Sequence, residues 1–208
     1  MSQPLPTKLS RAEARRLAFL EAAEKIFLTH GYSAANIKDV IQLASGSMAT
    51  LYSQFGNKEG LFEALVEHHI KHLRNPLEQL DVSEKSIQDG LIILGKAYLN
   101  AVLHPSAVSV YRLVVAESRI FPDLMKKIGS NRWHIRDSIM IFLQKRIQAG
   151  EIREVQVELV ATCFLDMLRG QHLAQAIYEP NYQINEKEMS EFVTQAVDLL
   201  CQGLLAHS

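Results

Sequence analysis

The side chains best suited to chemistry lie in a short helical segment near the N-terminus. At about 100° per residue from Met48 onward, one side of this helix carries Leu51, Tyr52 and Phe55, which we expect to face inward. The opposite side carries Ala49, Thr50, Ser53 and Gln54. Hydroxyl and amide groups on such a face can reach base edges in a DNA major groove, and the helix N-terminus can meet a phosphate. The same pattern also fits a polar face that meets only water.

Positive charge is concentrated just before this segment. Residues 1 to 60 hold seven Lys and Arg against five Asp and Glu, whereas the whole chain of 208 residues holds 22 against 23. Four of the seven cations lie between Lys8 and Arg16. The overall net charge of −1 argues against nonspecific coating of nucleic acid, so an anionic partner should be met by the N-terminal segment. A solvated basic terminus is the alternative.

Several helices are needed to position these residues. Ser10 followed by Glu13 predicts a capping box that opens a helix, and Gly31 predicts its end. Two short helices follow, over residues 37 to 44 and 48 to 55, joined by a three-residue turn at residues 45 to 47. Asn57 then caps a longer helix that runs past Leu73. Two short helices and a tight turn between longer helices are the layout of a DNA-binding helix-turn-helix.

The rest of the chain shows helical periodicity throughout. We expect helices over residues 83–103, 106–118, 123–149, 157–178 and 185–206, with Pro105, Pro122 and Gly150 between them. No segment alternates with the period of two that a strand would show. The sequence therefore predicts an all-α fold with an N-terminal three-helix helix-turn-helix over residues 1–56, a connecting helix over 57–75 and a larger helical domain over 76–208.

Composition and motifs exclude other classes of protein. The longest apolar runs have four to five residues, far short of the ~20 that a membrane span needs, and residues 1 to 8 do not resemble a secretory signal. We therefore expect a cytoplasmic protein without membrane contact. Cys163 and Cys201 are expected as buried free thiols. The sequence has no phosphate-binding Gly-rich loop, nucleophile elbow or HExxH motif, which predicts a protein that is not an enzyme and needs no cofactor.

Residues 27 to 61 resemble a known family. Phe27 is followed by Gly31 and Tyr32, then by the run Ile-Lys-Asp-Val at residues 37–40. Residues 50 to 61 fit the pattern Thr-Leu-Tyr-x-x-Phe-x-x-Lys-Glu-x-Leu. This stretch is similar to the DNA-binding domain of TetR/AcrR-type transcriptional regulators. The resemblance implies a homodimer that binds two half-sites of a palindromic operator, with a C-terminal domain that dimerises and holds a small-molecule effector.

The resemblance also implies DNA contacts. Carried onto this sequence, they fall on Asn36, Ile37, Ser47, Met48, Ala49, Thr50, Tyr52, Gln54 and Lys58, and Arg11, Lys8 and Arg15 would contact the backbone or minor groove. This chain departs from the family in its turn, which is Ser45-Gly46-Ser47 instead of Gly-Val-Ser, and in having Met48 at a usually basic position. Met48 is either core filler beside Leu51 or an apolar contact to a thymine methyl.

The C-terminal part resembles the ligand domain of AefR-like regulators over residues 111–124. Val110, Leu113, Val114 and Glu117 share one helix face, which places a carboxylate at the end of an apolar stripe. Glu117 either forms an ion pair with Arg136 or Arg119 or lines a pocket. The other pocket candidates, each of which is also compatible with a purely core position, are Tyr98, Leu113, Trp133, Met140, Phe164 and Met167.

Three further expectations concern the dimer interface, the histidines of the connecting helix and the contact between the two domains. Apolar stripes on the last two helices, around Phe164 and Phe192, predict a twofold four-helix interface. His68 and His72 have metal-ligand spacing without a completing acidic or cysteine cluster, so packing is favoured over a metal site. The helix after Lys58 is expected to be the only element that touches both domains. The favoured function is a transcriptional repressor that a small apolar or amphipathic ligand releases from its operator, and the alternative is a helical ligand-binding or interaction module with a vestigial helix-turn-helix.

Overall fold

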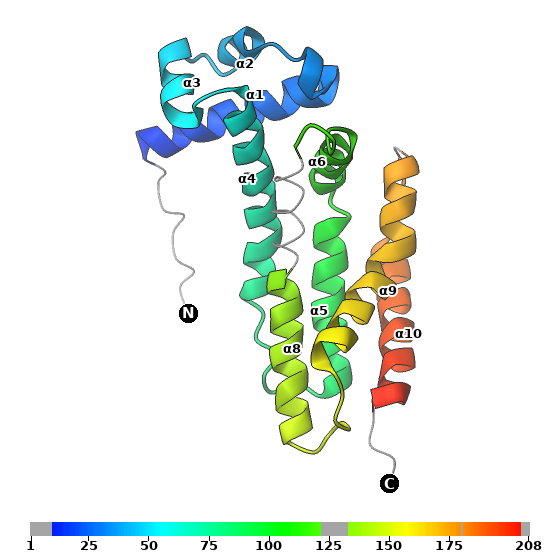
Figure 1. Ribbon diagram of the computed structural model, residues 1–208. Coiled ribbons are helices and arrows are strands. Elements are labelled where there is room, and N and C mark those ends of the chain that lie inside the picture. Colours follow the sequence, from blue (N-terminus) through cyan, green and yellow to red (C-terminus); the bar gives the residue numbers. More distant parts are fainter. Residues whose placement is uncertain (1–9, 122–132, 180, 205–208) are drawn as a thin grey trace. The chain divides into compact units, whose positions relative to one another are not determined.

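The computed structural model describes residues 10–121, 133–179 and 181–204, excluding the side chains of residues 73–78, 133, 134 and 204. The described residues form helices joined by short connections, with no β-strand among them, which confirms the all-α fold (Figure 1). Two compact units are present. Unit 1 contains residues 1–68 and 113–120, and unit 2 contains residues 69–112 and 121–208.

Unit 1 is built from α1 (Arg11–Ala34), α2 (Ile37–Leu43), α3 (Met48–Phe55) and the first part of α4 (Lys58–Glu78). The capping box is present, because Ser10 accepts a hydrogen bond from the Glu13 amide while the Glu13 carboxylate accepts one from the Ser10 amide. Gly31 interrupts α1 at φ +74°, as its sequence position predicts, and one more turn follows. The Asn57 side chain accepts a hydrogen bond from the Gly60 amide at 2.7 Å and so caps α4.

The core of unit 1 is aromatic. Phe19, Phe27 and Phe62 are completely buried, together with Leu51 and Leu61. The Phe27 and Phe62 rings meet edge to face at 5.6 Å between centroids, and Phe19 meets the Phe55 ring in the same way at 6.1 Å. Because Phe19 comes from α1 and both Leu51 and Phe55 come from α3, this core fixes the orientation of α3 on the unit.

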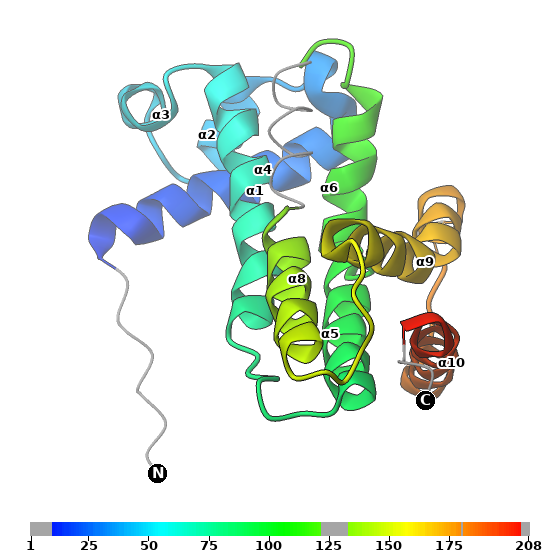
Figure 2. The ribbon, with the colours of Figure 1, turned by 60° about the horizontal axis from the view of Figure 1, so that its bottom comes forward.

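Unit 2 contains α5 (Ile87–Val102), the first part of α6 (Pro105–Ala116), α8 (Trp133–Gln148), α9 (Val157–Tyr178) and α10 (Glu186–Leu204). Helix α5 packs against α8, α9 and α10 (Figures 1 and 2). The approach of α8 is close, because a Cβ at Gly90 of α5 would lie 2.2 Å from the Phe142 ring. Leu91, Leu94, Leu99, Ile139, Leu143, Phe164, Leu168, Val193 and Val197 form the centre of this core.

Some helix boundaries differ from the expected ones. Helix α5 begins at Ile87 instead of residue 83, because Asp81 accepts hydrogen bonds from the Ser83 amide and hydroxyl and so forms a turn. The Ser86 side chain then caps α5. Pro105 was expected to separate two helices, but it is the first residue of α6. The amide at that position has no partner within the helix, so a proline there loses no hydrogen bond. Helix α4 continues to Glu78, and residues 123–132 of the expected 123–149 helix lie outside the described residues.

The cysteine expectation is half correct. Both cysteines are free thiols, and Cys201 is buried, but Cys163 is exposed. Burial raises the pKa of the Cys201 thiol above its usual value, with a smaller contribution from Asp198. Within the described part of the chain, no single helix is long and apolar enough to cross a membrane. Only α5 and α6 taken together reach that length and composition, and they are bent by 62°.

Candidate nucleic-acid interface

The turn between α2 and α3 places the third helix on the surface of unit 1. The Gly46 amide donates to the Ile41 carbonyl at 3.0 Å, and Ser45 has φ +49°, so α2 ends in a Schellman motif whose left-handed position is Ser45. The glycine one place later has a different role. A Cβ at Gly46 would lie 2.3 Å from Cζ of Phe19, so the Phe19 ring occupies the space above the turn. The unusual Ser-Gly-Ser sequence therefore still closes the turn.

Two consecutive arginines of α1 hold the C-terminal ends of both short helices. Arg15 donates to the carbonyls of Ala44 at 3.2 Å and Ser45 at 3.0 Å, at the end of α2. Arg16 donates to the Gln54 carbonyl at 3.5 Å, and its guanidinium lies 4.6 Å from the centre of the Phe55 ring. A cation at a helix C-terminus compensates the unpaired carbonyls there. Arg15 therefore has a structural role, and because its side chain is also exposed, its expected contact with DNA stays a prediction.

The N-terminus of α3 is capped within the helix itself. The Ser47 hydroxyl accepts a hydrogen bond from the Thr50 amide at 3.1 Å, and the two hydroxyls lie 2.8 Å apart. Met48 and Tyr52 are 41% and 45% exposed. Met48 is therefore not core filler, and the expected inward position of Tyr52 is wrong. Only Leu51 and Phe55 of that set are buried.

The residues expected to contact DNA fall into two groups by exposure. Those that are exposed are Arg11, Asn36, Ser47, Met48, Ala49 and Tyr52, whereas Ile37, Thr50, Gln54 and Lys58 are half-buried. Asn36 also caps α2 by accepting from the Lys38 amide at 2.9 Å. The Gln54 side-chain oxygen is buried without a hydrogen-bond donor in the described part of the structure. This oxygen would need a rotation of the side chain to reach a base. Lys8 lies outside the described residues.

Lys58 is held by protein groups at the start of α4. Its ammonium donates to the Ser33 carbonyl at 3.2 Å and lies 4.6 Å from the centre of the Tyr32 ring. Desolvation lowers the pKa of Lys58, and the charge of Glu117, from the end of α6, partly opposes that effect. Desolvation also raises the pKa of Tyr32, with smaller contributions from Glu59 and Glu117. Glu117 is thus near Tyr32 and Lys58, while Arg136 of unit 2 donates to Glu158 at 2.9 Å.

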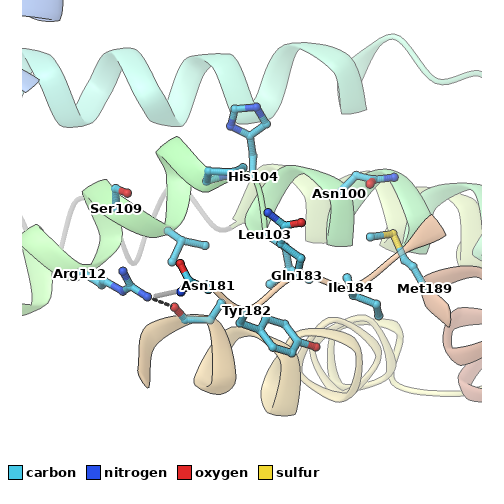
Figure 3. Close-up of a pocket in the computed structure, with 13 residues that line it drawn as sticks. Asn100, Leu103, His104, Ser109, Arg112, Asn181, Tyr182, Gln183, Ile184 and Met189 are labelled. Atoms are coloured by element: carbon cyan, nitrogen blue, oxygen red, sulfur yellow. Dashed lines mark hydrogen bonds between the residues drawn. The ribbon is translucent and has the colours of Figure 1, made fainter. Parts of the chain in front are cut away.

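Unit 2 contains a separate cavity of about 400 Å³ (Figure 3). It lies between the corner that joins α5 to α6 and the segment that joins α9 to α10. The lining residues are Asn100, Leu103, His104, Pro105, Val108, Ser109, Arg112, Ala176, Asn181, Tyr182, Gln183, Ile184 and Met189. None of the seven expected ligand-binding residues is among them.

Comparison with known proteins matches both parts of the chain. The model of the bacterial regulatory proteins of the tetR family matches residues 19–65, and that of the AefR-like transcriptional repressor C-terminal domain matches residues 89–203. The chain belongs to the TetR family. It is a DNA-binding transcriptional regulator, and the exposed polar face of α3 belongs to its helix-turn-helix.

Individual TetR-family proteins share sequence or fold with this chain. The HTH-type transcriptional repressor ComR of Escherichia coli K12 is 39% identical over 141 residues, which cover 66% of this chain and 67% of ComR. The flavonoid-responsive regulator FrrA superposes with a TM-score of 0.78 at 22% identity, over 93% of this chain and 98% of FrrA. FadR of Bacillus subtilis, solved with stearoyl-CoA, gives a TM-score of 0.71 at 19% identity, over 92% of this chain and 99% of FadR.

The expected ligand-binding residues of this TetR-family chain are divided between the two units. Leu113 and Glu117 belong to unit 1, where Leu113 is buried and Glu117 half-buried. Tyr98 and Phe164 are buried in the core of unit 2, and Met140 and Met167 are partly buried against that core. The Trp133 side chain lies outside the described part of the structure. Among the described residues, no group of three or more His, Cys, Asp and Glu could hold a metal ion.

Sequence reasoning did not identify the structural role of Arg16 or the cavity residues. The partners of Arg16 lie 38 and 39 residues away, and no local pattern indicates a contact at that distance. The cavity is lined by loop residues 181 to 184 together with residues of α5 and α6 that are distant in the sequence, so no local pattern indicates it either. One available signal was Arg112 of α6, which points away from the apolar stripe of that helix and must therefore find another environment.

Proposed function

We propose that this protein is a homodimeric repressor that binds a palindromic operator and is released from it by a small amphipathic ligand. The observation that carries the proposal is the surface of α3, whose outer residues are exposed while its two ends are fixed by Ser47 and Arg16. A fixed helix with a polar outer face suits base readout, because little conformational entropy is lost when it enters a groove. The proposed site of action is the cytoplasm, by binding and not by catalysis.

The proposed DNA contacts are those carried over from the family, and the exposure of each side chain decides how directly it can reach DNA. The exposed residues Ser47, Met48, Ala49 and Tyr52 can approach DNA without rearrangement, and Arg11 and Asn36 are exposed as well. Thr50 is half-buried but lies beside the Ser47 hydroxyl at the exposed end of α3. Residues 1–56 would bind DNA, and residues 76–208 would bind the ligand and dimerise. Residues 57–75 would form the helix that connects these two domains.

The proposed dimer uses α9 and α10. Leu159 of α9 and Leu199 of α10 are 57% and 66% exposed, and a Cβ at Gly170 of α9 would meet nothing within 4 Å. Exposed leucines on both helices, together with the open space at Gly170, are compatible with a partner helix that covers this face. Phe192 is a poor probe of the interface, because its ring packs edge to face on His172 at 4.4 Å within the protomer.

The dimer is tested by sedimentation equilibrium at micromolar concentration. Leu199→Glu should dissociate the dimer, because a carboxylate at that position would be desolvated by the partner. Ile141→Glu is the matched control, since Ile141 is 61% exposed on α8, outside the proposed interface. A wild-type monomer, or equal effects of the two substitutions, would contradict the proposed interface.

Operator binding is tested by selection from genomic fragments followed by affinity measurements. Thr50→Ala should weaken binding by about 1–3 kcal/mol and relax sequence preference at one position of each half-site. Thr29→Ala is a matched control on α1, where the Thr29 hydroxyl donates to the Lys25 carbonyl in the same helix. If the wild type shows no sequence-selective binding at low salt, the repressor function is wrong and the vestigial helix-turn-helix alternative is favoured.

The ligand class is suggested by relatives with the same fold. FrrA is named as flavonoid-responsive and FadR was solved in complex with stearoyl-CoA, and both of these compounds have large apolar parts. A ligand can release the operator only if it binds the DNA-incompetent arrangement more tightly. A coupling free energy of about 1–3 kcal/mol between ligand and operator would suffice for a clear response. The measurement is operator affinity with and without saturating ligand.

A further inference from the structure

The cavity in unit 2 has a polar end and an apolar end. In Figure 3, Arg112 and Ser109 lie at one end, and the large apolar side chains Ile184 and Met189 lie at the other, with the Asn100 amide beside them. Its volume of about 400 Å³ lies in the range of ~300–1,000 Å³ that is usual for small-molecule sites. A ligand that fits both ends must itself be amphipathic.

The charge of the polar end comes from Arg112. One of its terminal nitrogens donates to the carbonyl of Ala176 and, at 3.4 Å, to that of Glu179, at the C-terminal end of α9. Within the described residues no carboxylate pairs with Arg112, and its Nε is buried without an acceptor. The helix terminus carries only about half a negative charge, so the guanidinium keeps a net positive charge.

Other polar groups on the wall are also available. The side chains of Asn100, Ser109, Asn181 and Gln183 make no hydrogen bond with the described part of the chain. The lining includes no Asp or Glu. Glu179 and Glu188, whose charges help raise the pKa of Tyr182, contribute no side chain to the lining. A negative ligand would therefore meet donors and one cation that the α9 terminus compensates only in part, and no lining carboxylate would repel it.

We propose that this cavity binds a small carboxylic acid, with its carboxylate at Arg112 and Ser109 and its apolar body toward Ile184 and Met189. The inference rests on the proposed function, because it names the chemical class of the effector. Arginine suits this role because its planar guanidinium presents several donors in the geometry of a carboxylate. The two nitrogens that do not donate to the α9 carbonyls, Nε and the other terminal nitrogen, would bind the ligand.

The test compares probes that share an apolar body and differ in charge. Binding of octanoate, octan-1-ol and octylamine to the full-length protein is measured by isothermal titration calorimetry at neutral pH, with 4-phenylbutanoate as a second carboxylate. At least one carboxylate should bind about tenfold or more tightly than the alcohol and the amine, as expected for a charge-assisted hydrogen bond. If neither carboxylate binds more tightly than octan-1-ol, the proposal is wrong.

Variants locate the binding. Arg112→Met should remove the preference for carboxylates, and Arg112→Lys, which keeps the charge, should retain part of it. Ile184→Trp should fill the apolar end and weaken the binding of every probe without touching Arg112. Arg153→Met is the matched control, because Arg153 also donates to a helix-terminal carbonyl, that of Gly203 at 2.8 Å, but does not line the cavity.

The outcomes separate this inference from the proposed function. A carboxylate preference that survives Arg112→Met as well as it survives Arg153→Met would overturn the cavity assignment. Operator binding is measured on the same samples without any probe. Sequence-selective DNA binding together with absent carboxylate binding would overturn only the effector class. Carboxylate binding at Arg112 without DNA binding would support the cavity assignment and overturn the repressor function.

Discussion

Replacement of Gly46 tests how the turn of the helix-turn-helix is built. A Cβ at this position would lie 2.3 Å from Cζ and 2.6 Å from Cε1 of Phe19. Phe19 is completely buried and its ring meets Phe55 edge to face, so it has no free space into which to move. Overpacking of a core costs about 1–3 kcal/mol, and the lower entropy of the unfolded alanine chain offsets about 0.4–1 kcal/mol. Gly46→Ala should therefore destabilise unit 1 by about 1–2 kcal/mol.

The neighbouring serine provides the matched control with the opposite sign. Ser45 has φ +49°, and the left-handed conformation costs a non-glycine residue about 1–2 kcal/mol. Ser45→Gly removes that cost but raises the entropy of the unfolded chain by about 0.4–1 kcal/mol. A net stabilisation of about 0.5–1 kcal/mol should result. Both substitutions change one residue of the same turn, so a general intolerance of the turn to mutation cannot explain opposite effects.

Amide hydrogen exchange of α1 and α3 measures the two effects, because the most protected amides report the unfolding free energy of their own unit. Phe19→Leu combined with Gly46→Ala completes a double-mutant cycle, and the leucine should recover part of the loss if the ring is the obstacle. Equal protection in Gly46→Ala and wild type, or additivity of the two substitutions, would refute the assignment of Phe19 as the group that fills the turn.

Three further predictions concern contacts of single side chains. Lys58→Met should lower the stability of unit 1 by about 1 kcal/mol in hydrogen exchange even without DNA, because the ammonium bonded to Ser33 is lost. Arg16→Ala should weaken operator affinity through disorder at the end of α3, an effect that Arg16→Lys should partly reverse if its contact with Phe55 matters. Burial lowers the pKa of His172, so the folded state binds fewer protons than the unfolded state, and urea denaturation should show stability falling as the pH drops below about 6.5.

The sequence allowed prediction of most of the helices because their signals are local. Ser10, Ser47 and Asn57 each cap a helix through the amide three residues ahead, so the signal and the structure lie in the same short stretch. Gly31 has the positive φ that its position predicts. Tyr52 was misplaced because it lies at the border of the apolar sector of α3, where only the neighbouring helices decide exposure. Cys163 was misplaced because apolar neighbours in sequence do not indicate which face of α9 is covered.

The residues of the candidate sites were harder to predict because they depend on distant partners. Apolar periodicity selected Tyr98 and Phe164, and the structure places both in the core of unit 2. The cavity is instead lined by loop residues such as Asn181 and Gln183, which have no periodicity. The same difficulty affects Arg15, whose cationic character suggested DNA but whose acceptors are carbonyls 29 and 30 residues away.

Helix α6 contains residues of both units, which offers a second connection between the cavity and the helix-turn-helix besides α4. The helix after Lys58 was expected to be the only element shared by the two domains, but α6 also crosses the boundary between the units, which falls after Arg112. Arg112 lines the cavity, and Glu117, five residues later and just past the last residue of α6, lies near Lys58 and Tyr32 of unit 1. Because Arg112 and Ala116 belong to one continuous helix, a ligand that displaces Arg112 would also displace the residues that follow it. The proposed ligand at Arg112 would therefore act on a helix, α6, that continues into the helix-turn-helix unit, as α4 also does.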